Sequence, residues 1–336
     1  MAIEFFVKAV PENYPSIVLA KGGTGIVGRG ADWNPDLAMI KANMEYLERQ
    51  SCFQPLSSGI VWGTKDEVGP KARGVYADDM RHRWWCSALS FDTHEVYYFP
   101  LEFSQIESSC TIDKPLIKKN SAGFAAHHNL EKAISHGYRE VIEKKGIYLL
   151  WQEQVEHIFE ARGYNNTIDR FYHIFDENAY GLSLLIKQMT PDITVCGCVA
   201  TYVGQEDGRP ALVVGCGAGL SVSSSIENAM FECYAQLVNA MELVDEPKNG
   251  KFHFYFKSEN ARELVSRWFG NAKKYQAELF NKVPAYSGNE EAFYITRGSF
   301  FCEQNLKVHV VQVLVPDFEI YDIDDRGFPD MYSPFV

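Results

Sequence analysis

Two segments of the 336-residue chain follow the same pattern. Each begins with a Gly/Ala-rich stretch, continues through an Asn, and enters a predicted helix that carries two glutamates three residues apart, followed at once by a basic residue. These residues are Glu45, Glu48 and Arg49 in the first segment and Glu140, Glu143 and Lys144 in the second. The shared pattern predicts a duplicated acidic site on two helices.

The charge of these pairs indicates what the site binds. Residues three apart lie on one face of a helix. An apolar residue, Leu47 in the first pair and Ile142 in the second, lies between the two glutamates. If the two helices face each other, unit charges 4 Å apart repel by roughly 4 kcal/mol at an effective dielectric constant near 20. Carboxylate ligands favour hard cations such as Mg²⁺, which also bridges to phosphates. The alternative is four ordinary exposed glutamates paired with Lys or Arg.

Hydrophobic patterning predicts an α+β fold, with mixed β-sheets and packed helices built from internally repeated strand-loop-helix segments. Strands are expected at residues 16–19, 96–103, 193–203, 211–214, 252–256 and 308–315. Helices are expected at residues 35–50, 130–144, 225–241 and 261–268, with a further helical stretch near 152–162. Asn34 and Asn129 are suited to cap the two glutamate helices, and Pro35 suits a first helical position.

Two further stretches of the chain are rich in glycine, one beginning at Gly215 and one at Gly23. A weaker third copy of the pattern begins at Gly215; aligned through Ala229, it places Gln236 where Glu45 stands, so its helix is expected to flank the site. The stretch from Gly23 to Gly28 fits GxGxxG, but six residues, Arg29 to Asn34, separate it from the start of the helix, which argues against a dinucleotide-binding turn. The pair His127 and His128, just before the second helix, is a candidate contact for nucleotide or substrate, or simply a loop feature.

Composition narrows the possible partners and the compartment. The net charge of −12 argues against nucleic-acid binding, which needs clustered Lys and Arg. The N-terminus lacks the layout of a secretory signal, and no apolar run reaches the length of a membrane span, so a cytoplasmic protein without a membrane partner is expected. The eight cysteines are spread along the chain and are interpreted as reduced and buried.

At the paired helices, the chain resembles the YcaO family. Members carry a Gly/Ala-rich loop and an "Ala…Glu-x-x-Glu-Arg" helix near the start, followed by a "Ser-x-Gly-x-Ala-Ala" loop and a second Glu-x-x-Glu helix. The corresponding stretches here are Gly28-Arg29-Gly30-Ala31 and Ser121-Ala122-Gly123-Phe124-Ala125-Ala126, each with its glutamate pair. The resemblance covers nearly the entire chain and implies a single YcaO-type domain over residues 1–336, including a proline-containing tail at 326–336.

The resemblance also implies a reaction. The family uses ATP to activate a backbone amide oxygen of a peptide, so that a nucleophile adds to the amide carbon, the oxygen is phosphorylated and phosphate leaves. By this resemblance Mg²⁺ is held by the four glutamates, and ATP by residues around them. The implied metal ligands are Glu45, Glu48, Glu140 and Glu143, and the implied cofactor-binding residues are Glu45, Arg49, His128, Glu140 and Lys144.

Two features of this chain bear on the product. Ring-forming members end in a proline-rich tail whose terminal carboxylate lies in the active site, and a loose version of that tail makes Pro334 and Val336 the implied catalytic residues. Cyclodehydration of Cys, Ser or Thr in a ribosomally synthesised precursor peptide to thiazoline or oxazoline is therefore favoured. Thioamidation or sulfur transfer is the alternative. A catalytically silent scaffold is a third possibility, because Lys132 replaces a common acidic residue and Lys144 an arginine.

The implied partners follow from the same resemblance. No peptide-recognition domain is evident in the sequence, so a separate leader-peptide-binding protein is expected beside the precursor peptide. A flavin dehydrogenase is a possible further partner that would oxidise the rings. A dimer or a hetero-complex is also expected.

Overall fold

The computed structural model confirms a mixed architecture of helices and several β-sheets. It describes residues 3–56, 59–74, 80–104, 122–152, 157–204, 209–242, 269, 272–276, 291–301 and 307–316. The chain forms two compact units, Met1–Val141 with Asn289–Ile323 and Ile142–Gly288 with Asp324–Val336. The boundary between the two units falls inside helix α3 (Leu130–Gln152). A single domain over residues 1–336 stays a prediction.

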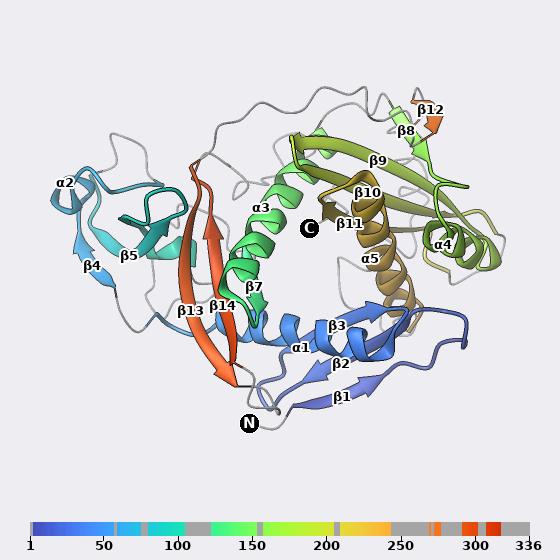
Figure 1. Ribbon diagram of the computed structural model, residues 1–336, viewed down its shortest axis with the longest axis horizontal. Coiled ribbons are helices and arrows are strands. Elements are labelled where there is room, and N and C mark those ends of the chain that lie inside the picture. The colour runs from blue at the N-terminus through green and yellow to red at the C-terminus, as the bar shows by residue number, and fades with distance from the viewer. Residues whose placement is uncertain are drawn as a thin grey trace. The chain divides into compact units, whose positions relative to one another are not determined.

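The first unit begins with a three-stranded antiparallel sheet in the order β1-β2-β3, on which helix α1 packs (Figure 1). Its elements are β1 (Glu4–Val7), β2 (Ser16–Lys21), β3 (Val27–Asp32) and α1 (Pro35–Cys52). Helix α1 starts as predicted: Pro35 is its first residue, and the Asn34 side chain accepts a hydrogen bond of 2.9 Å from the Asp36 N–H.

Small residues let α1 approach β3 closely. A Cβ atom at Gly30 would come 1.9 Å from the carbonyl oxygen of Ala38, and one at Gly28 would come 2.2 Å from that of Ala42. Only glycine therefore fits these two positions of the strand. The sequence interpretation treated this stretch as a loop; it is wrong there, because the glycines serve close strand–helix packing within a paired strand.

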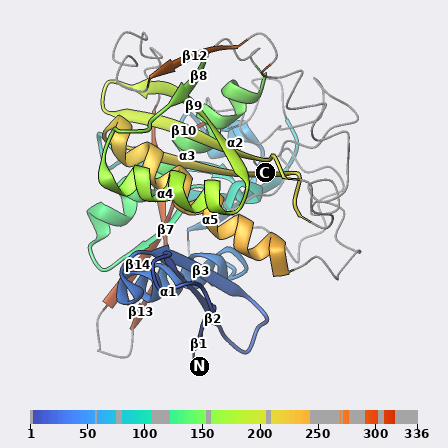
Figure 2. The same ribbon diagram turned by 90° about the vertical axis from the view of Figure 1, so that its right-hand side faces the viewer.

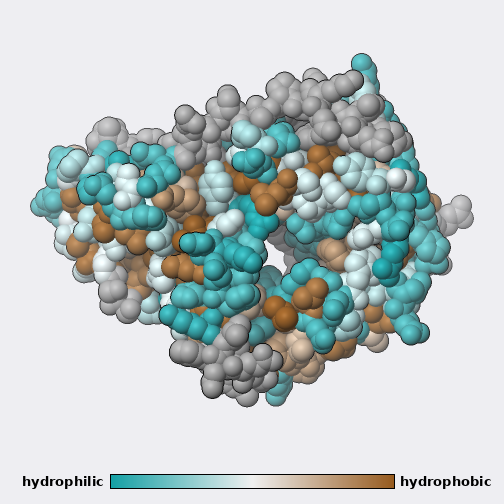
Figure 3. All heavy atoms as spheres, viewed as in Figure 1, coloured by the Kyte–Doolittle hydropathy of each residue, from teal (hydrophilic) through white to brown (hydrophobic). Residues whose placement is uncertain are grey.

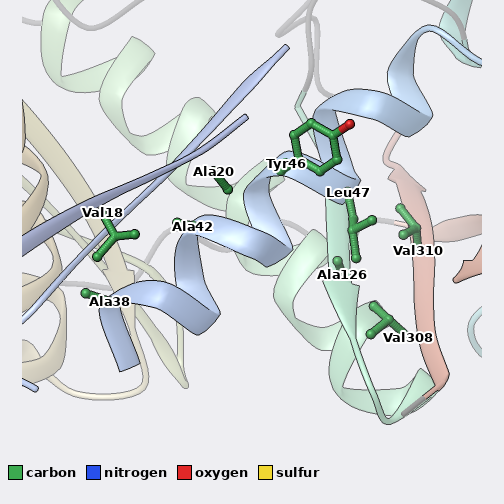
Figure 4. Packing of buried hydrophobic residues seen from close by; sticks show 9 residues of the cluster. All are labelled: Val18, Ala20, Ala38, Ala42, Tyr46, Leu47, Ala126, Val308 and Val310. Atoms are coloured by element: carbon green, nitrogen blue, oxygen red, sulfur yellow. The ribbon is translucent and has the colours of Figure 1, made fainter. Parts of the chain in front are cut away.

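A buried cluster around α1 ties this small sheet to the larger sheet of the same unit (Figure 4). Tyr46 and Leu47 of α1 point toward residues of β2, β7 and β14. The cluster consists of Val18, Ala20, Ala38, Ala42, Tyr46, Leu47, Ala126, Val308 and Val310. Burial of this apolar surface, at about 25 cal/mol per Å² removed from water, holds the helix that bears the first glutamate pair.

The larger sheet of the first unit has the strand order β4-β5-β13-β14-β7, with β6 paired to β5. Its strands are β4 (Ile60–Gly63), β5 (Arg83–Ser90), β6 (Val96–Pro100), β7 (Phe124–His127), β13 (Phe293–Phe301) and β14 (Lys307–Leu314). A short helix, α2 (Lys65–Val68), and a 3-10 helix (Leu101–Ser104) accompany them. The strand predicted at 96–103 thus ends at Pro100 and turns into the 3-10 helix.

The second unit is built on a five-stranded sheet in the order β11-β10-β9-β8-β12. Its elements are β8 (His157–Glu160), α4 (Asn166–Glu177), β9 (Tyr180–Thr190), β10 (Ile193–Tyr202), β11 (Leu212–Gly219), α5 (Val222–Glu242) and β12 (Lys273–Gln276). Helix α5 packs on β10 and β11, and α4 packs on β9 and α5 (Figures 1 and 2). Every residue of β11 is buried, as expected for a strand beneath a helix.

The structure corrects or extends several other predictions. The helix expected near 152–162 is wrong over 157–160, where the chain forms strand β8. Helix α3 runs to Gln152, beyond its predicted end at residue 144. The strand predicted at 252–256 and the helix predicted at 261–268 lie outside the described residues.

The cysteines are buried and the drawn face of the molecule is mainly hydrophilic. The six described cysteines are buried and form no disulfide, as predicted; they are Cys52, Cys86, Cys196, Cys198, Cys216 and Cys233. On the face drawn in Figure 3, hydrophilic residues prevail and hydrophobic ones are scattered among them. None of the described helices combines the length and the apolar character that a membrane span requires.

Candidate functional site

The first acidic cluster consists of Glu45 and Glu48 on α1 and Glu140 on α3. Two strand N–H groups fix the carboxylates of α1. The Arg29 N–H of β3 donates to Glu45 Oε2 over 2.5 Å, and the Ala126 N–H of β7 donates to Glu48 Oε1 over 2.7 Å. Because backbone donors hold one oxygen of each carboxylate, the side chains are oriented before any ligand binds.

The electrostatics of this cluster favour a cation. Burial raises the pKa of Glu48 well above its usual range, and the neighbouring Glu140 carboxylate raises it further, against the lowering effect of the Ala126 hydrogen bond. The charge of Glu140 therefore acts on Glu48, whereas the shared metal site of the two helices stays a prediction. Arg49 forms an ion pair of 2.5 Å with Glu45. A divalent cation would relieve the repulsion between the carboxylates.

A cavity of about 530 Å³ lies beside Arg49 in the first unit. It is lined by Thr24, Gly25, Ile26, Val27, Arg49, Cys52 and Phe53, which come from the β2–β3 turn and the end of α1. Arg49 also donates to the Val27 carbonyl oxygen over 3.0 Å. The stretch that fits GxGxxG thus forms a turn between two strands, with Gly25 at φ +77°, and not the strand-to-helix turn of a dinucleotide site.

The second acidic cluster consists of Glu143 on α3, Cys216 on β11 and Glu232 on α5, all in the second unit. The Cys216 thiol donates to Glu143 Oε1 over 3.2 Å and to Glu232 Oε2 over 3.0 Å. One candidate ligand atom from each of the three residues lies within 4.8 Å of the others. Burial raises the pKa of Glu143, with Lys144 opposing and Glu232 adding to the shift.

The two clusters share a hydrogen-bonding pattern. In each unit a strand N–H donates to a glutamate 16 residues later, from Arg29 to Glu45 and from Cys216 to Glu232. A second N–H, that of Ala126 in the first unit and Ala218 in the second, donates to the last glutamate of a pair. The repeat itself stays a prediction, but the local geometry is the same.

This pattern corrects the alignment of the third segment. A Cβ atom at Gly28 would meet the Ala42 oxygen at 2.2 Å, and one at Gly215 would meet the Ala229 oxygen at 2.4 Å. Ala229 therefore matches Ala42, and Glu232, not Gln236, matches Glu45. The sequence interpretation missed Glu232 and Cys216. Counting from the centre of Gly-x-Gly, which packs against the helix, finds both glutamates.

The remaining predicted site residues lie as follows. His127 is the last residue of β7, and its ring lies over that of the exposed His128 with centroids 4.0 Å apart. Burial lowers the pKa of His127, and His128 lowers it further. Lys144 follows Glu143 on α3 and acts on its charge. Pro334 and Val336 lie outside the described residues.

The donor set fits Mg²⁺ and a triphosphate. Carboxylate oxygens are the ligands that hard divalent cations prefer, and a backbone N–H group holds each of Glu45, Glu48 and Glu143. The adjacent guanidinium of Arg49 is a suitable phosphate contact. Among the described residues of the two acidic clusters, the Cys216 thiol is the one soft metal ligand.

The chain has recognisable relatives. The family model described as "YcaO cyclodehydratase, ATP-ad Mg2+-binding" matches residues 27–319. No curated protein sequence gives a significant match. A solved heterocyclase in complex with substrate and cofactor is similar with a TM-score of 0.76 and 16% identity over 93% of this chain. The match covers 49% of that protein, so the chain spans about half its length.

Two other solved structures match over most of their own length. YcaO from Methanopyrus kandleri, bound with AMPPCP and Mg²⁺, gives a TM-score of 0.74 and 17% identity over 98% of this chain and 90% of that one. The E. coli microcin synthetase McbBCD complex with pro-MccB17 bound gives a TM-score of 0.73 and 12% identity. That match covers 93% of this chain and 87% of the other. The family match over most of the sequence, and the fold shared with these structures, show that the chain belongs to the YcaO family.

Proposed function

We propose that this protein activates peptide backbone amides with ATP and Mg²⁺, and that it converts Cys, Ser or Thr residues of a ribosomally synthesised precursor peptide into thiazolines or oxazolines. The observation that carries the proposal is the first acidic cluster, in which backbone N–H groups orient Glu45 and Glu48 while Glu140 lies close enough to Glu48 to raise its pKa. The family description of ATP and Mg²⁺ binding supports it.

The metal ligands of this proposal are Glu45, Glu48, Glu140 and Glu143, and we add Glu232 because it lies with Glu143 and Cys216 in the second acidic cluster. When bound, Mg²⁺ and ATP supply charge neutralisation and a phosphoryl group for the amide oxygen, which is otherwise a poor leaving group. The protein's own part is to hold the carboxylates in place, through the strand N–H groups described above. Preorganised charge of this kind is usually the largest contribution to catalysis.

The proposed nucleotide contacts come from helices α1 and α3 and from the turn before α3. Arg49 orients phosphate groups, and the cavity beside it offers room for part of the nucleotide. Glu45, His128, Glu140 and Lys144 complete the proposed cofactor-binding set. The catalytic role that the resemblance implies for Pro334 and Val336 stays a prediction.

The proposed partners are a precursor peptide and a separate leader-peptide-binding protein, with a flavin dehydrogenase as a further component. The structural relatives support this, because one is described as a heterocyclase with substrate and another as a microcin synthetase complex with pro-MccB17. We place the protein in the cytoplasm, as a dimer or within a hetero-complex, without a membrane or nucleic-acid partner.

The test is phosphate release by the purified protein with ATP, Mg²⁺, a Cys- and Ser-containing peptide and its binding partner. Glu45→Gln and Glu140→Gln should each reduce release by about 100-fold or more, because each removes a charged ligand. Glu131→Gln is the matched control, since Glu131 is an exposed glutamate in the first turn of α3. Equal activity of Glu45→Gln, Glu140→Gln and the control would refute the metal assignment.

Product mass and calorimetry separate the alternatives. Loss of one water per modified residue marks a ring, whereas exchange of oxygen for sulfur marks a thioamide. A protein that binds no nucleotide in the presence of Mg²⁺ would instead be a scaffold of a modification complex.

A further inference from the structure

Arg297 lies at an irregularity of strand β13. The pairing of β13 with β14 shifts register between Thr296 and Gly298, so that Arg297 has no pairing partner on β14. Such a bulge turns a side chain out of the regular alternation of a strand. In this protein the bulge directs the Arg297 side chain to the end of helix α1, in the same unit.

The guanidinium of Arg297 caps α1. Its Nη2 donates to the carbonyl oxygen of Ser51 over 2.8 Å and to that of Gln54 over 2.6 Å. The guanidinium also lies 5.4 Å from the centre of the Phe124 ring, at the start of β7. A positive charge at a helix C-terminus interacts favourably with the helix dipole and with the last carbonyl groups. The Ser51 carbonyl oxygen also accepts from the Gln54 N–H over 3.2 Å.

Arg297 is an unusual arginine in its surroundings. None of the ion pairs found among the described residues involves it, and its Nε and Nη1 are buried without an acceptor in that part of the chain. Burial lowers its pKa, while the nearby thiols of Cys52 and Cys86 raise it. Burying a guanidinium without a carboxylate is costly, so the contact with the end of α1 is its principal compensation.

The end of α1 carries the groups that the first acidic cluster needs. Arg49 lies in the last turn, and the Cys52 thiol donates to the Glu48 carbonyl oxygen over 3.3 Å. Any fraying of this turn would move the Glu48 and Arg49 side chains away from the strand N–H and carbonyl groups that orient them.

We propose that Arg297 is a positioning residue that fixes the last turn of α1 and thereby holds Glu48 and Arg49 in place for metal and phosphate. This inference rests on the proposed function of the first acidic cluster. Arg297 acts through the carbonyl groups of Ser51 and Gln54 and not by contact with metal or substrate.

The test compares Arg297→Gln and Arg297→Lys with Arg83→Gln. Arg83 is a matched control because it is a buried arginine of the same sheet, paired with Glu102 over 3.2 Å and away from α1. The readouts are the Mg²⁺ concentration for half-maximal phosphate release, the binding of ATP with Mg²⁺ by calorimetry, and the hydrogen exchange of amides 49–54.

Arg297→Gln should raise the Mg²⁺ requirement roughly 10-fold, as expected when a group that orients a metal ligand is lost. Arg297→Lys should fall between Arg297→Gln and wild type, since lysine keeps the charge without the planar fork. Arg83→Gln should lower the melting temperature but leave the Mg²⁺ requirement within about twofold of wild type, since distant sites act independently. Amides 49–54 should exchange faster in the Arg297 variants only.

Two results would overturn the inference: an Mg²⁺ requirement of Arg297→Gln equal to that of Arg83→Gln, or unchanged exchange of amides 49–54. If Arg297→Gln does not fold, Arg297→Lys gives the same two readouts. Absence of Mg²⁺-dependent nucleotide binding in the wild-type protein would refute the proposed function instead, and the exchange experiment would still decide whether Arg297 fixes α1.

Discussion

The first and second acidic clusters hold their carboxylates in the same way but balance the charge differently. In both, strand N–H groups donate to glutamates on the packed helices. In the first cluster a guanidinium, that of Arg49, pairs with Glu45. In the second, a thiol, that of Cys216, lies between Glu143 and Glu232. One kind of scaffold therefore supports two electrostatic environments.

The difference shows how acidic residues are kept together before a ligand binds. Burial and the neighbouring carboxylates raise the pKa of Cys216 far above its usual range. The thiol therefore stays protonated and serves as a hydrogen-bond donor to these carboxylates. Burial raises the pKa of both Glu143 and Glu48, but Lys144 and the Cys216 thiol oppose the shift at Glu143, whereas at Glu48 the Glu140 carboxylate adds to it and the pKa lies well above its usual range. We expect the first cluster to be the more strained of the two without metal, and the predictions below test this.

The largest expected effect is that of Glu48→Gln, which should act on stability and activity in opposite directions. A folded-state pKa above the unfolded value stabilises the protein at low pH, and that contribution is lost as pH rises through the folded pKa. Without metal, Glu48→Gln should therefore become increasingly more stable than wild type as pH rises from 5 to 8. Its peptide-dependent phosphate release should fall by about 100-fold or more.

Urea unfolding with a chelator present measures how the stability of Glu48→Gln and of wild type depends on pH. Adding Mg²⁺ should reverse the order, because metal binding stabilises only the protein that keeps the carboxylate. Parallel stability curves of the two proteins across this pH range would show that Glu48 is not strained.

The next effect concerns the glycines beneath the helices. Gly28→Ala and Gly215→Ala should each cost about 3 kcal/mol of unfolding free energy, because the new Cβ atom would collide with helix backbone atoms at 2.2 Å in both cases. Gly25→Ala is the control: nothing lies within 4 Å, so only its positive φ matters, at roughly 1 kcal/mol. Chemical denaturation measures all three. Tolerance of alanine at Gly215 but not at Gly28 would mean that the two strand–helix pairs are not alike.

A smaller effect is expected at Cys216. Cys216→Ala removes the donor shared by Glu143 and Glu232 and should cost about 1 to 2 kcal/mol in metal-free protein. Cys216→Ser keeps an O–H donor and should cost less. Thermal unfolding with a chelator distinguishes them. Equal losses in the two variants would show that the thiol only fills space, and the contrast between the clusters would then disappear.

The sequence predicted the helix that bears Glu45 and Glu48 well because its information is local. The spacing of Glu45 and Glu48, the Asn34 cap and Pro35 all act within one helix, and the structure confirms each of them. The matched pattern around Glu140 also indicated that the carboxylates of α1 and α3 interact, which the raised pKa of Glu48 supports.

The second cluster could not be predicted in the same way, because its members depend on tertiary packing. Alanines occur at several positions of a helix, so Ala229 alone did not fix the register; the close approach of Gly215 to the helix does. Likewise the residues of β8 formed a strand by pairing with β9 and β12, against a local pattern that favoured a helix. Arg297 was missed because a bulge cannot be recognised from residue types alone.

The smallest expected effect compares the basic residues that follow the two glutamate pairs. Arg49 contacts both Glu45 Oε1 and the Val27 carbonyl oxygen, which lysine cannot match with the same planar geometry. Because the Arg49 side chain is exposed, Arg49→Lys should change stability by only about 0.5 kcal/mol. Its effect on nucleotide binding should be larger, a loss of about threefold, if the guanidinium contacts phosphate in two places.

Lys144→Arg is the matched change in the second cluster and should have the opposite sign. It keeps the charge beside Glu143 and supplies the planar guanidinium that Arg49 has in the first cluster, so ATP affinity at saturating Mg²⁺ should rise. Calorimetric measurement of ATP affinity in both variants decides whether both basic residues contact phosphate or only Arg49 does. Opposite signs would mean that both positions contact phosphate and that arginine is the better contact. A loss in both would mean that Lys144 serves Glu143 alone, since a bulkier guanidinium would then disturb the pair without gaining a ligand.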